Sequence, residues 1–214
     1  MNAPTKRAPL QLAALRRELE THLDATRGAI QDEFGGPDQS FSELTKDVTY
    51  ERTLRAADVV IEHAVWLERR LQTLGERLRL LEPELGTGRT QAVLANENLS
   101  DVVSRHRDRC YKTVDQLNGY TRERLEVMAV HAPVSKSTTC ADPADADHGR
   151  VVTSQKEVPS SLVGECVRRF DALWLWRARV YLIDVAEHTR VVADRLKKDD
   201  DAVESEPLSV RMLG

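Results

Sequence analysis

The 214-residue chain contains few residues that interrupt helices, with only 10 glycines and 8 prolines, and these cluster rather than scatter. Long stretches therefore carry no helix breaker. The three cysteines, Cys110, Cys140 and Cys166, are far apart and form no Cys-x-x-Cys pair. They support neither a disulfide framework nor a zinc site.

The sequence also lacks long apolar runs and an excess of basic charge. No run approaches the roughly 18 apolar residues of a membrane-spanning helix. Near the N-terminus, Arg16, Arg17 and Glu18 interrupt the apolar positions, so no signal-peptide core is evident. Acids and bases are interleaved and sum to a net charge of −4, so we expect no nucleic-acid partner. These absences predict a cytoplasmic protein without a transmembrane segment.

Familiar catalytic motifs are missing as well. The chain has no glycine-rich phosphate-binding loop, no Gly-x-Ser-x-Gly and no His-Glu-x-x-His. A di-iron bundle requires Glu-x-x-His, whereas His63 and His188 each directly follow a glutamate. We therefore expect no metal, no cofactor and no enzymatic activity.

The clearest positive signal is a heptad pattern between Tyr50 and Leu85. Eleven positions alternate steps of three and four residues without a slip, and the last six are leucines. This pattern is typical of a helix with coiled-coil character, which we predict over 40–84 with a capping box formed by Ser40 and Glu43. We expect a partner to bind along its leucine stripe: Leu67, Leu71, Leu74, Leu78 and Leu81.

Two further helices are predicted in the first 131 residues. The segment 9–34 carries leucines at helical spacing and ends at Gly35-Gly36-Pro37. The segment 90–131 has a weaker apolar stripe, and Asn118-Gly119 marks a point where it can kink.

The rest of the chain divides into one more helix and three segments without periodicity. We predict the last helix over 160–198. The non-periodic segments are expected to be a flexible N-terminus, a disordered loop rich in Ser, Thr, Asp and Pro, and a disordered acidic tail: 1–8, 132–159 and 199–214. Together the elements predict an all-α protein, an elongated antiparallel bundle of about four helices in one domain.

The last predicted helix is apolar nearly all round over Phe170–Ile183. Three explanations are open: a place at the centre of the bundle, an interface with another subunit, or a foothold on a membrane surface. For the interface, Trp174, Trp176 and Ile183 are the candidate partner-binding residues. On the same helix, Asp184 and His188 are four residues apart and can touch, either to orient the histidine for acid–base chemistry or to fix helix register.

One short segment suggests an enzyme. In RLEVMAVH, Arg124 and His131 stand with six residues between them on a helical segment. This spacing resembles the Arg-x(4–6)-His signature of HEPN-type ribonucleases, which are dimeric helical bundles. The resemblance covers eight residues and implies that Arg124 and His131 would contact and cleave RNA. Leu125 stands where that family commonly has a polar residue.

From these patterns we expect a non-enzymatic interaction protein, a structural or adaptor subunit of a protein assembly. Its partners would be further copies of itself or coiled-coil subunits of a larger complex. The alternatives are a HEPN-like ribonuclease or toxin-type enzyme, and a bundle that binds a membrane surface or nucleic acid.

Overall fold

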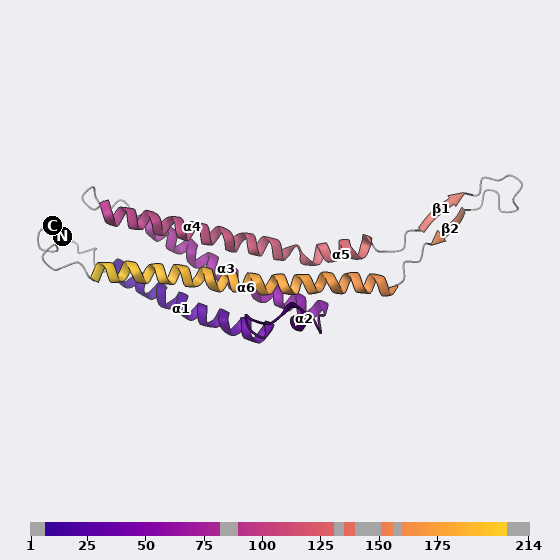
Figure 1. Ribbon diagram of the computed structural model, residues 1–214. Coiled ribbons are helices and arrows are strands. Elements are labelled where there is room, and N and C mark those ends of the chain that lie inside the picture. Colours follow the sequence, from indigo (N-terminus) through magenta and orange to yellow (C-terminus); the bar gives the residue numbers. More distant parts are fainter. Residues whose placement is uncertain (1–6, 82–89, 131–134, 140–150, 156–159, 205–214) are drawn as a thin grey trace, which may run out of the picture.

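The computed structural model describes residues 7–81, 90–130, 135–139, 151–155 and 160–204. It is an all-α, elongated bundle of long helices lying side by side, which confirms the predicted fold class (Figure 1). The longest helix has 45 residues and spans roughly 68 Å at 1.5 Å per residue. The described residues form six helices: α1 (Arg7–Phe34), α2 (Phe41–Leu44), α3 (Tyr50–Leu81), α4 (Thr90–Asn118), α5 (Tyr120–Val130) and α6 (Ser160–Glu204).

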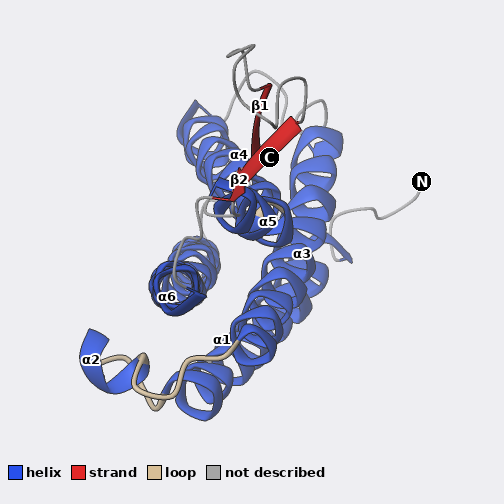
Figure 2. Cartoon of the chain, turned by 90° about the vertical axis from the view of Figure 1, so that its right-hand side faces the viewer, coloured by secondary structure: helices blue, strands red, loops and turns tan. Residues whose placement is uncertain are grey.

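Helices α3 and α6 form the middle of the bundle, with α4 on one side and α1 on the other (Figure 2). The two central helices run parallel to each other, and α1 and α4 run in the opposite direction (Figure 1). Helix α1 packs mainly along α6, and α4 packs mainly along α3. None of the described helices has an apolar stretch that would let it cross a membrane.

The heptad pattern of α3 marks the face that this helix buries. Every patterned position from Thr53 to Leu78 is buried, including the four leucines of that range. The apolar side chains of α1, α4 and α6 cover this face. At the other end of the bundle, a second cluster gathers Phe34, Leu44, Tyr120, Trp174 and their neighbours. Burial of these apolar side chains stabilises the bundle.

The predicted helix over 40–84 is divided in two. Ser40 and Glu43 form the expected capping box, but the helix that they begin, α2, ends at Leu44. Helix α3 has its own start, because the Thr49 hydroxyl accepts the backbone amide of Arg52 at 3.1 Å, as an N-cap does. The β-branched Thr45, Val48 and Thr49 between the helices disfavour a continuous helix.

Glycines end α1 and α4 where the sequence indicated. The positive φ of Gly35 (70°) and Gly36 (105°) suits glycine, and their amides bond back to α1 carbonyls. Gly119 separates α4 from α5, and its amide bonds to the carbonyl of Gln116 at 3.2 Å. The predicted helix 90–131 is therefore two helices, with the break at the predicted kink.

Three other predicted segments differ from the structure. Helix α1 begins at Arg7, so it includes the last two residues of the predicted flexible N-terminus, 1–8. The segment 132–159, predicted to be a disordered loop, contains an antiparallel hairpin of β1 (Ser135–Thr139) and β2 (Val151–Gln155) (Figure 1). Each strand contains two or three β-branched residues, Thr in β1 and Val and Thr in β2, and β-branched residues favour extended backbone. Helix α6 continues to Glu204, through the start of the tail predicted to be disordered. The remainder of that tail lies outside the described residues.

Candidate functional site

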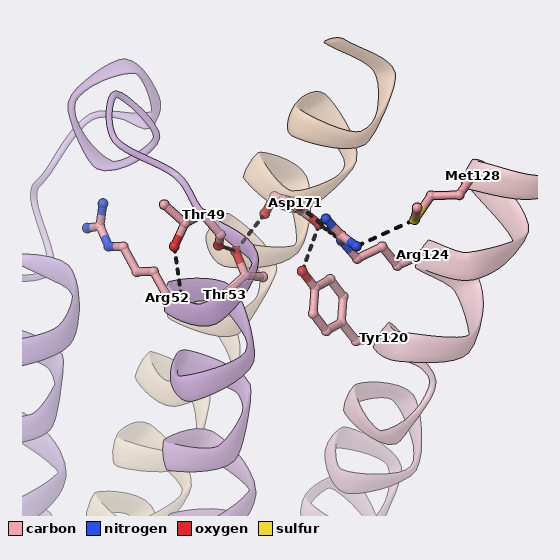
Figure 3. Close-up of polar contacts among 7 residues, drawn as sticks. All are labelled: Thr49, Arg52, Thr53, Tyr120, Arg124, Met128 and Asp171. Carbon is pink, nitrogen blue, oxygen red and sulfur yellow. Dashed lines mark hydrogen bonds and ion pairs between the residues drawn. The ribbon is translucent and has the colours of Figure 1, made fainter. Parts of the chain in front are cut away.

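A buried carboxylate, Asp171, lies where α3, α5 and α6 meet (Figure 3). Its Oδ1 accepts hydrogen bonds from the Tyr120 hydroxyl at 2.7 Å and from Nε of Arg124 at 2.9 Å. Its backbone carbonyl lies 3.4 Å from the hydroxyl of Thr53, which makes its shorter hydrogen bond, at 2.9 Å, to the carbonyl of Thr49. One α6 residue thus bonds to α5 and contacts α3. We call Thr53, Tyr120, Arg124 and Asp171 the Asp171 network.

The charges of this network are compensated within it. Burial raises the pKa of the Tyr120 phenol, and its hydrogen bond to Asp171 raises it further. Burial lowers the pKa of Arg124, but hydrogen bonding and attraction to Asp171 outweigh this and raise it above its usual value. The Tyr120 phenol therefore stays protonated and Arg124 stays charged at neutral pH. These charged and polar groups hold α5 and α6 together.

Aromatic rings pack around the network. The ring of Tyr120 stacks with Tyr50 at 5.9 Å and with Phe170 at 6.1 Å, and it lies 5.2 Å from Trp174. The guanidinium of Arg124 lies over the ring of Tyr50 at 4.5 Å. Because a low-dielectric environment strengthens ion pairs and hydrogen bonds, these contacts reinforce the bonds of Asp171. This arrangement accounts for part of the aromatic run in α6.

Arg124, the arginine of the ribonuclease-like pattern, belongs to this network. Its Nε contacts both carboxylate oxygens of Asp171, and only 20% of its side chain is exposed. Packing of α5 on α6 accounts for this arginine without any RNA. His131 lies outside the described residues, so the ribonuclease alternative stays a prediction.

Trp176 is half-buried and packs against α2 and against Arg179 of its own helix. Phe41 of α2 meets the indole edge-on at 5.6 Å, and the guanidinium of Arg179 lies over it at 4.6 Å. Arg179 is buried and donates to the carbonyls of Gly36 and Pro37. It therefore fastens the connection between α1 and α2 onto α6.

The other predicted partner-binding residues lie mostly inside the chain's own core. Ile183 is half-buried, whereas Trp174 and most of the leucine stripe are buried: Leu67, Leu71, Leu74 and Leu78. The side chain of Leu81, the last residue of α3, lies outside the described part of the structure. Since the same chain already covers them, the buried residues present no free surface to a partner.

Four histidines form two pairs within the bundle. His22 of α1 lies against His63 of α3, with ring centroids 5.0 Å apart, and His106 of α4 lies against His188 of α6, 4.7 Å apart. The predicted contact between Asp184 and His188 does not form a hydrogen bond, because Nδ1 of His188 is buried without a partner. Burial raises the pKa of Asp184, and Arg109 opposes that shift. His188 faces another imidazole, so Asp184 does not orient it for acid–base chemistry.

The described cysteines and carboxylates do not add a reactive or metal site. Burial raises the pKa of Cys110 to about 12, which leaves its thiol protonated, and Cys166 is half-buried. Within the described ranges, no three His, Cys, Asp or Glu side chains come close enough to bind a metal ion. Cys140 lies outside those ranges.

Sequence reasoning missed the roles of Asp171 and Tyr120. Asp171 stands between Phe170 and Ala172 in the most apolar part of α6, and a single carboxylate there requires a buried partner. Tyr120 directly follows the glycine that breaks the helix. The position of Asp171 was a usable signal, whereas the choice of Tyr120 and Arg124 as partners depends on how α5 packs.

No known protein family, curated protein or solved structure matches this chain. Its function has to be inferred from the geometry described above.

Proposed function

We propose that this chain is a non-enzymatic helical-bundle protein of the cytoplasm that works by binding other protein chains through the outer face of α6. One observation carries the proposal: Leu162, Leu173 and Val180 are 48%, 59% and 37% exposed. Eleven and seven residues separate them, so at 100° per residue they lie within about 20° of one another around the helix. We call these three residues the outer stripe.

The outer stripe lies opposite the face of α6 that packs in the bundle. Arg169, Arg177 and Asp184 are exposed beside it, so charged groups flank an apolar line. A helix in solution rarely benefits from three large exposed apolar residues on one line, whereas apolar positions flanked by charges are typical of helix–helix interfaces. The partner proposed is a helix, from a second copy of this chain or from another coiled-coil subunit.

The interior supports a non-enzymatic role. Asp171, Tyr120 and Arg124 bond to one another, and Arg179 bonds to backbone carbonyls. These hydrogen bonds hold the helices and their connections together. A direct check is incubation with RNA, for which we expect no cleavage. Cleavage that the His131→Ala variant abolishes would contradict this part of the proposal.

Light scattering tests the surface. We expect a mass above the monomer's 24.1 kDa, and a return to that mass when Leu173→Glu and Val180→Glu are combined. Both residues are exposed, so the helical circular dichroism signal should not change. Tyr111→Glu is the matched control, because Tyr111 is 64% exposed on α4, away from the outer stripe.

A wild-type monomer would restrict the proposal to partners of another kind. In that case, a partner subunit captured from the native host should bind the wild type and the Tyr111→Glu variant but not the double glutamate variant. Equal capture by all three proteins would contradict a role for the outer stripe.

A further inference from the structure

The two histidine pairs join helices that otherwise touch little. Helix α1 packs mainly on α6, but its His22 lies against His63 of α3. Helix α4 packs mainly on α3, but its His106 lies against His188 of α6. We call the α1–α3 and α4–α6 contacts the histidine seams. Each seam joins an outer helix to the central helix with which it shares the smaller contact.

The first seam leaves one ring nitrogen of His22 without a hydrogen-bond partner. This Nε2 is buried, and the ring stacks on Trp66 at 3.9 Å, whereas a hydrogen bond to the backbone of His63 favours the charged form of His22 to a smaller extent than burial opposes it. The hydroxyl of Thr26 donates to the carbonyl of His22, so His63 must donate its Nδ1 proton to Thr26 Oγ1 at 3.0 Å. Protonation of either ring would place a charge among apolar groups and beside a second imidazole. Glu62 is the one described carboxylate that favours the charged form of His63.

The second seam also buries ring nitrogens that have no hydrogen-bond partner, namely the Nδ1 atoms of His106 and His188. The charged groups around this pair are Arg105 and Arg109 of α4, which oppose protonation, and Glu187 of α6, which favours it. Glu187 is itself held by Arg190, at 2.6 Å. From α3, Glu68 acts on Cys110, one turn along α4 from His106.

We propose that the histidine seams make the bundle sensitive to acid, so that acidification separates α1 from α3 and α4 from α6. A cation in either seam would be partly desolvated and next to another imidazole. Separation returns the rings to water. It also uncovers apolar core surface, including the buried leucines of α3, for which the helices along these seams form part of the cover.

The direction of the pH dependence follows from the shifted pKa values. Burial and the neighbouring imidazole lower the pKa of His22 and of His106 from 6.5 to about 4. Burial also lowers the pKa of His63 and of His188. The unfolded chain therefore binds protons that the folded chain does not. This contribution to stability is fully present above pH 6.5 and is lost as the pH falls toward about 4.

The experiment measures chemical unfolding of the full chain from pH 7.5 to pH 4.5. For each histidine that is neutral in the folded chain, the unfolding equilibrium constant rises roughly tenfold for each unit by which the pH falls. This holds between the pKa of the histidine in the unfolded chain and its pKa in the folded chain. We expect His22→Gln and His106→Gln each to reduce this dependence by about one proton, and the double variant by about two. Glutamine stays neutral throughout this range. Binding of an apolar dye to the wild type should rise over the same range, because core surface is uncovered.

The matched control is Leu117→Ala, which trims the α4 core eleven residues away from His106. It should lower stability equally at every pH. If the glutamine variants do not fold, NMR titration of the wild-type imidazoles decides the question: in the folded protein His22 and His106 should not titrate above pH 5, and the pKa values of His63 and His188 should lie below 6.5. The proposal is overturned if these imidazoles titrate near pH 6.5 in the folded protein, or if folded glutamine variants keep the wild-type pH dependence.

Discussion

Two of the places where the described part of the bundle buries polar groups, the Asp171 network and the histidine seams, are built differently. In the Asp171 network, the carboxylate has a donor from Tyr120 and another from Arg124. In the histidine seams, His22, His106 and His188 each bury a ring nitrogen without a partner. The network carries compensated charge, whereas the seams stay stable only while their rings are neutral.

The end of the bundle that contains the Asp171 network should therefore keep its stability as the pH falls, whereas the histidine seams should lose theirs. A buried group with all its partners resists change, because removing any partner leaves another group unsatisfied. A buried imidazole without a partner contributes little as a hydrogen-bonding group, and it becomes costly when it gains a proton. Substitutions in the two places should therefore differ in size and in pH dependence.

The largest effect is expected for Asp171→Ala. It leaves Arg124 and the Tyr120 hydroxyl without their acceptor, and we expect a loss of about 2 to 4 kcal/mol in unfolding free energy. The control is the double variant Asp171→Leu with Arg124→Met, which removes both charges and should recover part of the loss. Denaturant unfolding at pH 7 measures both. A loss below about 1 kcal/mol for Asp171→Ala would show that the network does not hold the bundle.

A smaller effect is expected for Tyr120→Phe. This change removes one hydrogen bond to a charged acceptor but keeps the ring and its stacking, so we expect a loss of about 1 to 2 kcal/mol. The loss should be independent of pH between 5 and 8, since Tyr120 does not titrate there. Tyr111→Phe, at an exposed tyrosine, is the control and should have no measurable effect.

The effect of His106→Leu on the unfolding free energy should change sign between pH 7 and pH 5. At pH 7 it replaces an unpartnered neutral ring with an apolar group, so the unfolding free energy should change by less than about 1 kcal/mol. At pH 5 the wild type has lost about 2 kcal/mol through this histidine, so the variant should be the more stable protein. If the variant is equally destabilised at both pH values, His106 contributes to stability in the same pH-independent way as the groups of the Asp171 network, and this would contradict the account.

The smallest effect is expected for Arg190→Ala. Arg190 contacts Glu187 at 2.6 Å and Asp194 at 2.9 Å, but all three side chains are about half exposed. Solvent screens such pairs, so the melting temperature should stay unchanged within error. A large decrease would show that surface ion pairs, and not only buried ones, hold α6.

The helices could be predicted from the sequence because their signals are local. The heptad positions of α3, the capping box at Ser40 and the break at Gly119 each depend on residues within a turn or two of one another. The division between α2 and α3 was missed because the β-branched Thr45 and Val48 weaken a helix only slightly, and the cap at Thr49 decides the outcome. The hairpin was missed because short Ser- and Thr-rich strands resemble loops in composition.

The functional groups were harder to predict because their partners lie far apart in the sequence. Asp171 contacts Arg124, which is 47 residues away in the sequence, and His22 of α1 contacts the ring of His63 of α3. Helical periodicity shows which face of a helix is buried but not which neighbour covers it. For this reason the sequence placed His188 beside Asp184, whereas packing of α4 on α6 places it against His106.

Native-state hydrogen exchange at pH 7 and at pH 5.5, converted to opening free energies, compares the two places most directly. We expect amides of α1 and α4 near His22 and His106 to lose protection at pH 5.5. Amides of α5 and α6 around Tyr120 and Asp171 should keep theirs. Equal loss along the whole bundle, or earlier loss around Asp171, would contradict the account.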